Sequence, residues 1–69
     1  MERSGWTFRT TERGDHQRIW RVVEPDLAIA EELVRIALPS ATKIEALDPI
    51  DYATVTRIGL SLGQIQEWS

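Results

Sequence analysis

The chain contains no cysteine and only one histidine, His16. Without cysteine, no disulfide can brace the fold, and no thiolate can bind zinc or act as a nucleophile. One histidine is too few for an ordinary zinc site, and no serine lies near it in the sequence. A glycine-rich phosphate loop is also missing, because Gly59 and Gly63 stand four residues apart with no lysine after them. These absences argue against an enzyme, and we expect no catalytic residues, no metal and no other cofactor.

Long apolar runs are missing as well. None approaches the roughly 20 residues that a membrane-spanning helix needs, and the first five residues are not followed by the apolar stretch of a signal peptide. We therefore expect a cytoplasmic protein without a membrane anchor. The chain has 69 residues, of which 42% are hydrophobic and 28% are charged. Because these values are ordinary for a globular chain, residues 1–69 are expected to form one small domain, with residues 1–5 flexible.

The small size and the uneven charge both bear on possible partners. A domain of this length buries only about 60% of its unfolded surface, and small domains without disulfides often gain stability by self-association. Residues 1–21 carry five basic side chains against three acidic ones, whereas residues 22–69 carry three against eight. The two halves can attract each other within one fold. Alternatively, the basic half can meet an acidic partner or a second copy of the chain.

The segment of residues 6–24 predicts a β-hairpin. Residues 6–12 alternate in period two, which is typical of a strand with one buried face. Residues 17–24 are rich in side chains that favour strands. Between them lies Arg13-Gly14-Asp15, the tripeptide that integrins recognise. We interpret it as a turn that needs glycine, because no secretory signal is present.

The length of this turn decides which side chains share a face. A two-residue turn would place an arginine opposite Phe8. A three-residue turn at residues 14–16 gathers aromatic side chains on one face and sets Glu12 opposite Arg18. We favour the three-residue turn, because it buries three rings together: Trp6, Phe8 and Trp20.

Residues 25–38 predict an amphipathic helix laid across the hairpin. Pro25 suits the first helical position, and Pro39 ends the helix. Its apolar side chains cover an arc of roughly 200°, so the helix should contact more than one element. The narrow polar stripe includes Glu31 and Arg35 at the stabilising i,i+4 spacing. A two-stranded ribbon is marginal alone, and this helix supplies the hydrophobic face that it lacks.

The remainder of the chain predicts a third strand and short helices. Thr42–Leu47 alternates as a strand that can join the hairpin. Asp48-Pro49 has the character of a helix N-cap and first helical residue. Residues 52–58 are compatible with a strand or a helix, and we favour a helix that ends at Gly59.

Ser61 and Gln64 have the spacing of a capping box, which predicts a last short helix ending near Trp68. The resulting fold class is α+β, a single domain of order ββαβα. In it the N-terminal hairpin packs on one amphipathic helix, and a third short strand joins an antiparallel or mixed sheet. One or two short C-terminal helices then close the core.

The C-terminal part also has the spacing of a helix-turn-helix. Apolar positions flank the turn at Gly59, and the run from Arg57 to Glu67 resembles the helix-turn-helix after the DNA-reading unit of MerR-type regulators. The resemblance implies a DNA-binding regulator with contacts from Arg57, Ser61, Gln64 and Gln66. However, DNA binding relies on lysines and arginines that displace counterions from phosphates, and the second helix has none. We therefore favour two helices that simply close the core.

The hairpin offers a second nucleic-acid hypothesis. Its arginines and aromatic side chains resemble the basic, aromatic ribbons that bind single strands by stacking. The residues concerned are Arg9, Arg18, Arg21, Trp6, Phe8 and Trp20. In so short a chain the rings are needed as core, and the arginine stems can pack on the sheet. We favour the structural role.

By elimination, we expect a small non-enzymatic protein-interaction module. Its partner would be a second copy in a homodimer, or another protein, paired along an open strand edge of the sheet. The contact would be lined by Thr7, Arg9 and Thr11 of the first strand, or by Ile19, Arg21 and Val23 of the second. The DNA-binding regulator is the rival hypothesis.

Overall fold

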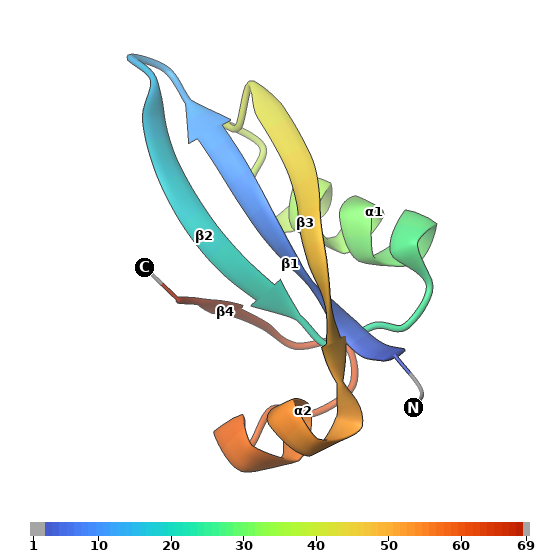
Figure 1. Ribbon diagram of the computed structural model, residues 1–69. Helices are drawn as coiled ribbons and strands as arrows, with labels where there is room; N and C mark the ends of the chain where they lie inside the picture. The colour runs from blue at the N-terminus through green and yellow to red at the C-terminus, as the bar shows by residue number, and fades with distance from the viewer. Residues whose placement is uncertain (1–2, 69) are drawn as a thin grey trace.

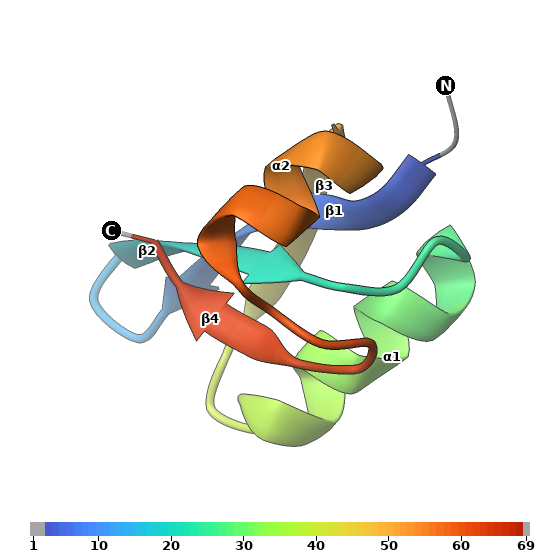
Figure 2. The ribbon, with the colours of Figure 1, turned by 90° about the horizontal axis from the view of Figure 1, so that it is seen from below.

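The structure is a computed structural model that describes residues 3–68 (Figure 1). Within this range the strands and helices are β1 (Arg3–Glu12), β2 (His16–Val22), α1 (Leu27–Ala37), β3 (Lys43–Asp51), α2 (Tyr52–Ile58) and β4 (Ile65–Glu67). The strands form one antiparallel sheet in the order β3-β1-β2-β4. Figure 2 shows α1 and α2 on opposite sides of this sheet. The α+β class is therefore confirmed.

The register of the hairpin confirms an odd turn, at a position one residue earlier than predicted. β1 and β2 pair from Trp6 opposite Val22 to Glu12 opposite His16, around residues 13–15. Gly14 and Asp15 both adopt positive φ angles, +82° and +61°, a conformation that glycine and aspartate tolerate better than most residues. Glu12 therefore does not stand opposite Arg18, although the arginine still reaches its carboxylate at 3.6 Å.

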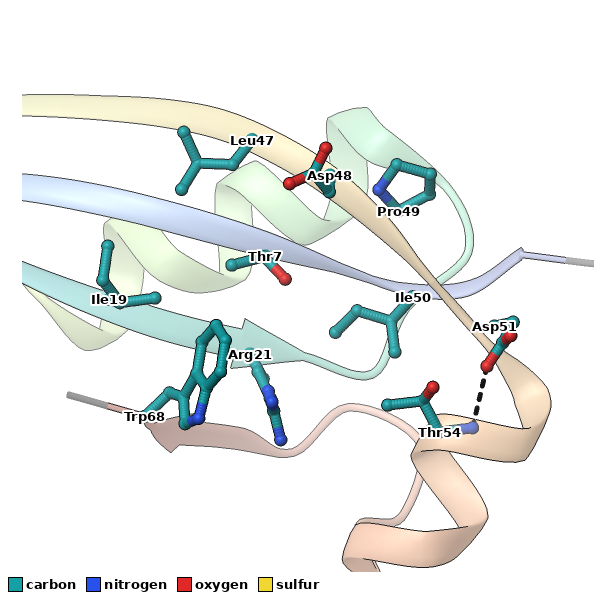
Figure 3. Close-up of a pocket in the computed structure, with 10 residues that line it drawn as sticks. All are labelled: Thr7, Ile19, Arg21, Leu47, Asp48, Pro49, Ile50, Asp51, Thr54 and Trp68. Atoms are coloured by element: carbon teal, nitrogen blue, oxygen red, sulfur yellow. Dashed lines mark hydrogen bonds between the residues drawn. The ribbon is translucent and has the colours of Figure 1, made fainter.

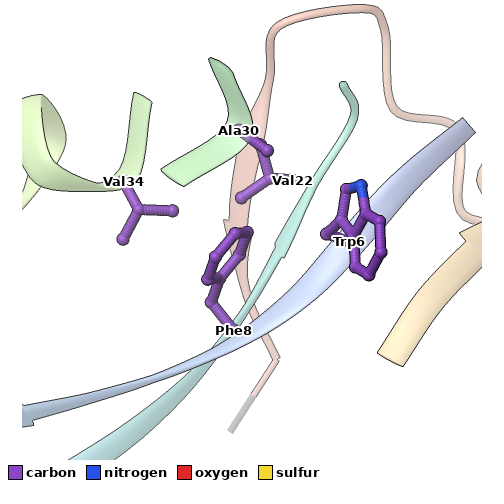
Figure 4. Packing of buried hydrophobic residues seen from close by; sticks show 5 residues of the cluster. All are labelled: Trp6, Phe8, Val22, Ala30 and Val34. Atoms are coloured by element: carbon purple, nitrogen blue, oxygen red, sulfur yellow. The ribbon is translucent and has the colours of Figure 1, made fainter. Parts of the chain in front are cut away.

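The main core lies between α1 and the central hairpin (Figure 4). Trp6, Phe8 and Val22 project from the sheet toward Ala30 and Val34 of the helix, and all five side chains are buried. The indole N–H of Trp6 also donates to the carbonyl of Pro25 at 3.1 Å. The predicted packing of an aromatic face beneath one helix is confirmed for two of the rings.

Trp20, the third ring, is only half-buried. Its indole N–H donates to the hydroxyl of Thr10 at 2.9 Å, and the Arg18 guanidinium carbon lies 4.7 Å from its ring centroid. This ring therefore sits at the margin of the core, where its polar group finds a partner and an arginine shields its face.

The helix α1 begins two residues later than predicted. Asp26 is the N-cap, and its carboxylate accepts hydrogen bonds from the backbone N–H groups of Ala28 and Ile29 at 2.9 and 3.2 Å. Pro25 therefore precedes the helix rather than opening it, because a side-chain acceptor at residue 26 satisfies backbone donors of the first turn.

The strand β3 is longer than predicted and contains Asp48 and Pro49, which do not begin a helix. Pro49 lies opposite Trp6, where the pairing with β1 shifts register. A proline is tolerated there because β3 is an edge strand, and edges and bulges are where a missing N–H costs least. Asp51 instead is the N-cap of α2, with its carboxylate accepting from Thr54 N–H at 2.8 Å.

The prediction of a helix at residues 52–58 is confirmed, and the helix ends at Gly59 in the left-handed region with φ 75°. Its Val55 joins Val23 and Ile50 in a second, smaller core, against which Leu60 packs. The helix α2, which contributes Val55, lies on the side of the sheet away from α1 (Figure 2).

The predicted last helix is wrong. Gln64 N–H donates to the carbonyl of Ser61 at 3.0 Å, and Ser61 N–H donates to the side-chain oxygen of Gln64 at 2.6 Å, so these residues close a turn. Gly63, at the third position of this turn, has φ +84°, which a helix does not allow. Residues 65–67 then pair with β2 as β4.

Residues 3–5, which we expected to be flexible, belong to β1, while residues 1 and 2 lie outside the described part. Gly5 is needed here because a Cβ atom would collide with the carbonyl oxygen of Val22 and lie 3.2 Å from Val23 Cα. The backbone of β1 thus approaches β2 more closely than a side chain permits.

We expect Gly5→Ala to lower the free energy of unfolding by about 2 kcal/mol, as overpacking against backbone does. Urea unfolding followed by tryptophan fluorescence measures the change. Ser4→Ala, on the adjacent residue, is the matched control and should change stability by less than about 0.5 kcal/mol. Equal stability of Gly5→Ala and the wild type would contradict the close approach of the two strands.

Candidate functional site

The six residues predicted to line an edge contact do not lie at an edge. They belong to β1, β2 and the residue after β2, and both strands are inner strands with neighbours on each side. The predicted edge position is therefore wrong. β3 occupies the outer side of β1, and β4 occupies the outer side of β2, which the prediction of a final helix left open.

Three of the six residues are already engaged within the fold. Arg9 donates from Nε to the carboxylate of Glu45 at 3.2 Å, and its terminal nitrogen approaches the same oxygen at 3.1 Å. The carbonyl of Thr11 accepts from the backbone N–H of Thr42 at 2.7 Å. Val23 is buried in the second core. These contacts hold β3 and α2 in place.

The other three residues, Thr7, Ile19 and Arg21, line one hollow on the side of the sheet away from α1 (Figure 3). The hollow has a volume of about 640 Å³ and is open to solvent. Its other lining residues are Leu47, Asp48, Pro49, Ile50, Asp51, Thr54 and Trp68. The structure therefore brings half of the predicted contact residues together, on a face of the sheet rather than along its edge.

The register of the sheet explains how this hollow forms. Thr7 stands opposite Arg21 on β2, and on its other side the pairing with β3 is interrupted between Trp6 and Phe8. This irregularity bends β3 so that Leu47 and Asp48 flank the middle of the hollow. The turn into α2, which Asp51 caps, forms one end wall.

Trp68 forms the opposite side of the hollow, and sequence reasoning missed it by assigning it to a core helix. The Arg21 guanidinium carbon lies 4.0 Å from the centroid of the indole ring, and 57% of Trp68 is exposed. The backbone N–H of Trp68 donates to the carbonyl of Ile19 at 2.8 Å. Residues 65–67 read apolar, polar, polar, so no period-two alternation was available to identify this segment as a strand.

An ion pair holds β4, the strand that Trp68 follows. Arg18 donates from Nε and Nη2 to the two carboxylate oxygens of Glu67, at 3.0 and 2.7 Å. This paired geometry is the favourable one for arginine and carboxylate. The hydrogen bond from Arg18 lowers the pKa of Glu67, and the same bond raises the pKa of Arg18. Together with the backbone ladder, the pair places Trp68 over Arg21.

Charge is divided across the hollow. Among residues 3–68, no carboxylate or carbonyl accepts a hydrogen bond from the Arg21 guanidinium, and Asp48 has no ion-pair or hydrogen-bond partner for its carboxylate. Asp51 is engaged, because hydrogen bonds from the side chain and the backbone of Thr54 lower its pKa. The hollow thus has one uncommitted positive group and one uncommitted negative group, on strands separated by β1.

The residues of the DNA-binding hypothesis do not lie on one helix. Arg57 is in α2, Ser61 and Gln64 bond to each other in the turn, and Gln66 pairs with Arg21 in the sheet. The helix-turn-helix is therefore wrong in its second helix, and the resemblance to MerR-type regulators does not extend to the structure.

The hairpin does not present a stacking platform for single strands. Trp6 and Phe8 are buried beneath α1, and Arg9 and Arg18 are paired with Glu45 and with Glu67. Stacking requires exposed rings, so these two aromatic side chains are unavailable to bases.

Two further kinds of feature are absent from residues 3–68. No group of three or more histidine, aspartate or glutamate side chains is arranged to hold a metal ion. Neither helix in this range has the length and apolarity to cross a membrane.

We expect Glu67→Gln to loosen the end of β4, because it removes the charge that Arg18 binds. The backbone amide of Trp68 should exchange hydrogen faster, since its bond to Ile19 depends on β4 staying paired. Hydrogen exchange measured by NMR tests this. Glu32→Gln is the matched control, because it breaks an exposed ion pair with Arg35 on α1 and should leave the Trp68 amide unchanged.

The lowered pKa of Asp51 makes the attachment of α2 depend on pH. Folding favours the ionised carboxylate, so its stabilisation is present above the unfolded pKa, about 4, and is lost as pH falls through the lower folded value. Urea unfolding between pH 7 and pH 2.5 should show a smaller loss of stability for Asp51→Asn than for the wild type. Asparagine caps helices without titrating, so identical pH profiles would contradict the prediction.

Comparisons with protein-family models, with curated proteins and with solved structures found no match to this chain. The hollow and the contacts that shape it are therefore the features from which function can be inferred.

Proposed function

We propose that this chain is a non-enzymatic protein-binding module, and that it binds through the open sheet face around Trp68. The observation that supports this most is the exposed indole held over Arg21 on a face that α1 does not cover. Tryptophan and arginine are enriched at binding hot spots, because they offer large contact areas together with specific polar groups. A tryptophan with backbone and ion-pair support also loses little conformational freedom on binding.

The occupant that fits this surface is an extended segment of another protein. Ile19, Leu47 and Ile50 give the hollow an apolar lining, and Arg21 and Asp48 give it polar groups on two sides. A volume of about 640 Å³ accommodates a few side chains. Because the hollow is open, a continuous segment that extends past its walls buries Trp68 better than an isolated small molecule would.

Selection from a random peptide display library on the immobilised wild-type protein tests this proposal. We expect enriched peptides to bind Trp68→Ala at least tenfold more weakly, measured by fluorescence anisotropy with synthetic peptides. Tyr52→Ala is the matched control, because Tyr52 is 66% exposed but does not line the hollow, and binding should change less than twofold. Failure to enrich any peptide, or equal binding to Trp68→Ala, would overturn the proposal.

Self-association through a sheet edge is the second candidate. It is favoured by β4, whose outer side is unpaired within residues 3–68. The bonds of Gln64 and Trp68 to β2 imply that the backbone groups of Ile65 and Glu67 point outward. β3 is a poorer edge, because Pro49 and a bulge interrupt it.

A homodimer formed at β4 should dissociate on dilution, since only three residues of each copy would pair. Light scattering across a hundredfold dilution series should show the mass fall from twice the chain mass toward one. A single-chain mass at every concentration, up to about one millimolar, would rule out this candidate and leave the peptide-binding proposal untouched.

A further inference from the structure

Among the described residues, Arg21 has no carboxylate within ion-pair distance, which is also true of Arg13 and Arg57, but of these three arginines only Arg21 lines the hollow. Arg9 binds Glu45, Arg18 binds Glu67, and Arg35 binds both Glu31 and Glu32. These carboxylates lie within reach of their arginines along strands or helix turns. Arg21 is half-buried in the hollow, and Trp68 is its only partner in a charge or ring contact among residues 3–68.

The contact with Trp68 fixes where the donors of Arg21 are presented. A guanidinium over an indole is held by the ring, while the N–H groups around its edge remain available to acceptors. Figure 3 shows the Arg21 side chain beside the indole at one side of the hollow. An arginine held in this way is prepared for bidentate recognition of a carboxylate, since little side-chain freedom remains to be lost.

The other charges of the hollow do not oppose an anion at this position. Asp51 is committed to Thr54 at the start of α2. Asp48 lies on β3, two strand positions from β2, which corresponds to about 10 Å between backbones. At physiological salt the screening length is about 8 Å, so repulsion from Asp48 is weak beside a direct ion pair.

We propose that Arg21 and Trp68 form a subsite for an aspartate or glutamate side chain within the bound protein segment, next to an apolar residue that contacts Ile19 and Leu47. This inference rests on the proposed function and specifies the chemistry of the partner. Charge complementarity to Arg21 favours an acidic side chain in the partner, and the apolar lining of the hollow favours an apolar residue next to it. Asp48 disfavours a second acidic residue at the far side.

Peptides enriched on the wild-type protein test the subsite directly. We expect them to share an acidic residue within two positions of a large apolar one. Arg21→Gln should weaken their binding at least tenfold, and replacing the acidic residue of the peptide by its amide should weaken binding by a similar factor. The two changes combined should weaken binding little more than either change alone, which is the signature of a direct contact.

Two further arginine variants test whether the effect is specific to Arg21. Arg57→Gln removes an arginine from α2 outside the hollow and should change binding less than twofold. Arg21→Lys keeps the charge without the planar fork, and should show an intermediate loss together with an unchanged thermal unfolding midpoint. Peptides that lack an acidic residue, or that bind Arg21→Gln as well as wild type, would overturn this inference while leaving the proposed function intact.

A phosphate-bearing partner is a further outcome of the same experiment. A single-stranded oligonucleotide of twelve thymidines should not displace the peptides at 150 mM salt. Displacement at stoichiometric oligonucleotide, with a steep dependence on salt, would assign the Arg21 subsite to nucleic acid and would overturn the acidic-peptide inference. Failure of any peptide to bind the wild-type protein would overturn the proposed function itself.

Discussion

The packing of α1 on the central hairpin is the interaction on which the remaining structure depends. Phe8 and Val22 of the sheet and Ala30 and Val34 of the helix are fully buried, and no other part of the described chain contains so dense an apolar cluster. One eleven-residue helix covers only one face of the sheet. The opposite face is therefore left to short elements from the second half of the chain, and that is where the hollow forms.

The second core determines the shape of this opposite face. Val23, Ile50 and Val55 attach α2 at one end of the sheet, so α2 forms a wall there and leaves the middle of the face uncovered. The capping hydrogen bond of Asp51 fixes the direction in which the chain leaves β3. The hollow thus exists because a small chain lacks the apolar surface to cover both faces of a four-stranded sheet.

The proposed binding surface depends on the shortest strand. β4 has three residues, and its attachment combines backbone bonds to β2 with the ion pair between Arg18 and Glu67. Edge elements of this kind open at lower free-energy cost than central strands. Trp68 therefore combines a defined position with the ability to adjust, which is a useful property for a surface that receives a partner.

Local sequence determined the hairpin with its odd turn, the amphipathic helix beneath the aromatic rings, and the helix at residues 52–58. Each of these follows from periodicity, turn residues or caps within a short segment. Local sequence did not determine the conformation of residues 61–68. The reciprocal bonding of Ser61 and Gln64 is compatible with a helix start or a turn, and the free edge of β2 decided between them by accepting β4. The same tertiary choice placed Trp68 over Arg21, because contacts between distant segments depend on sheet order, which no local pattern encodes.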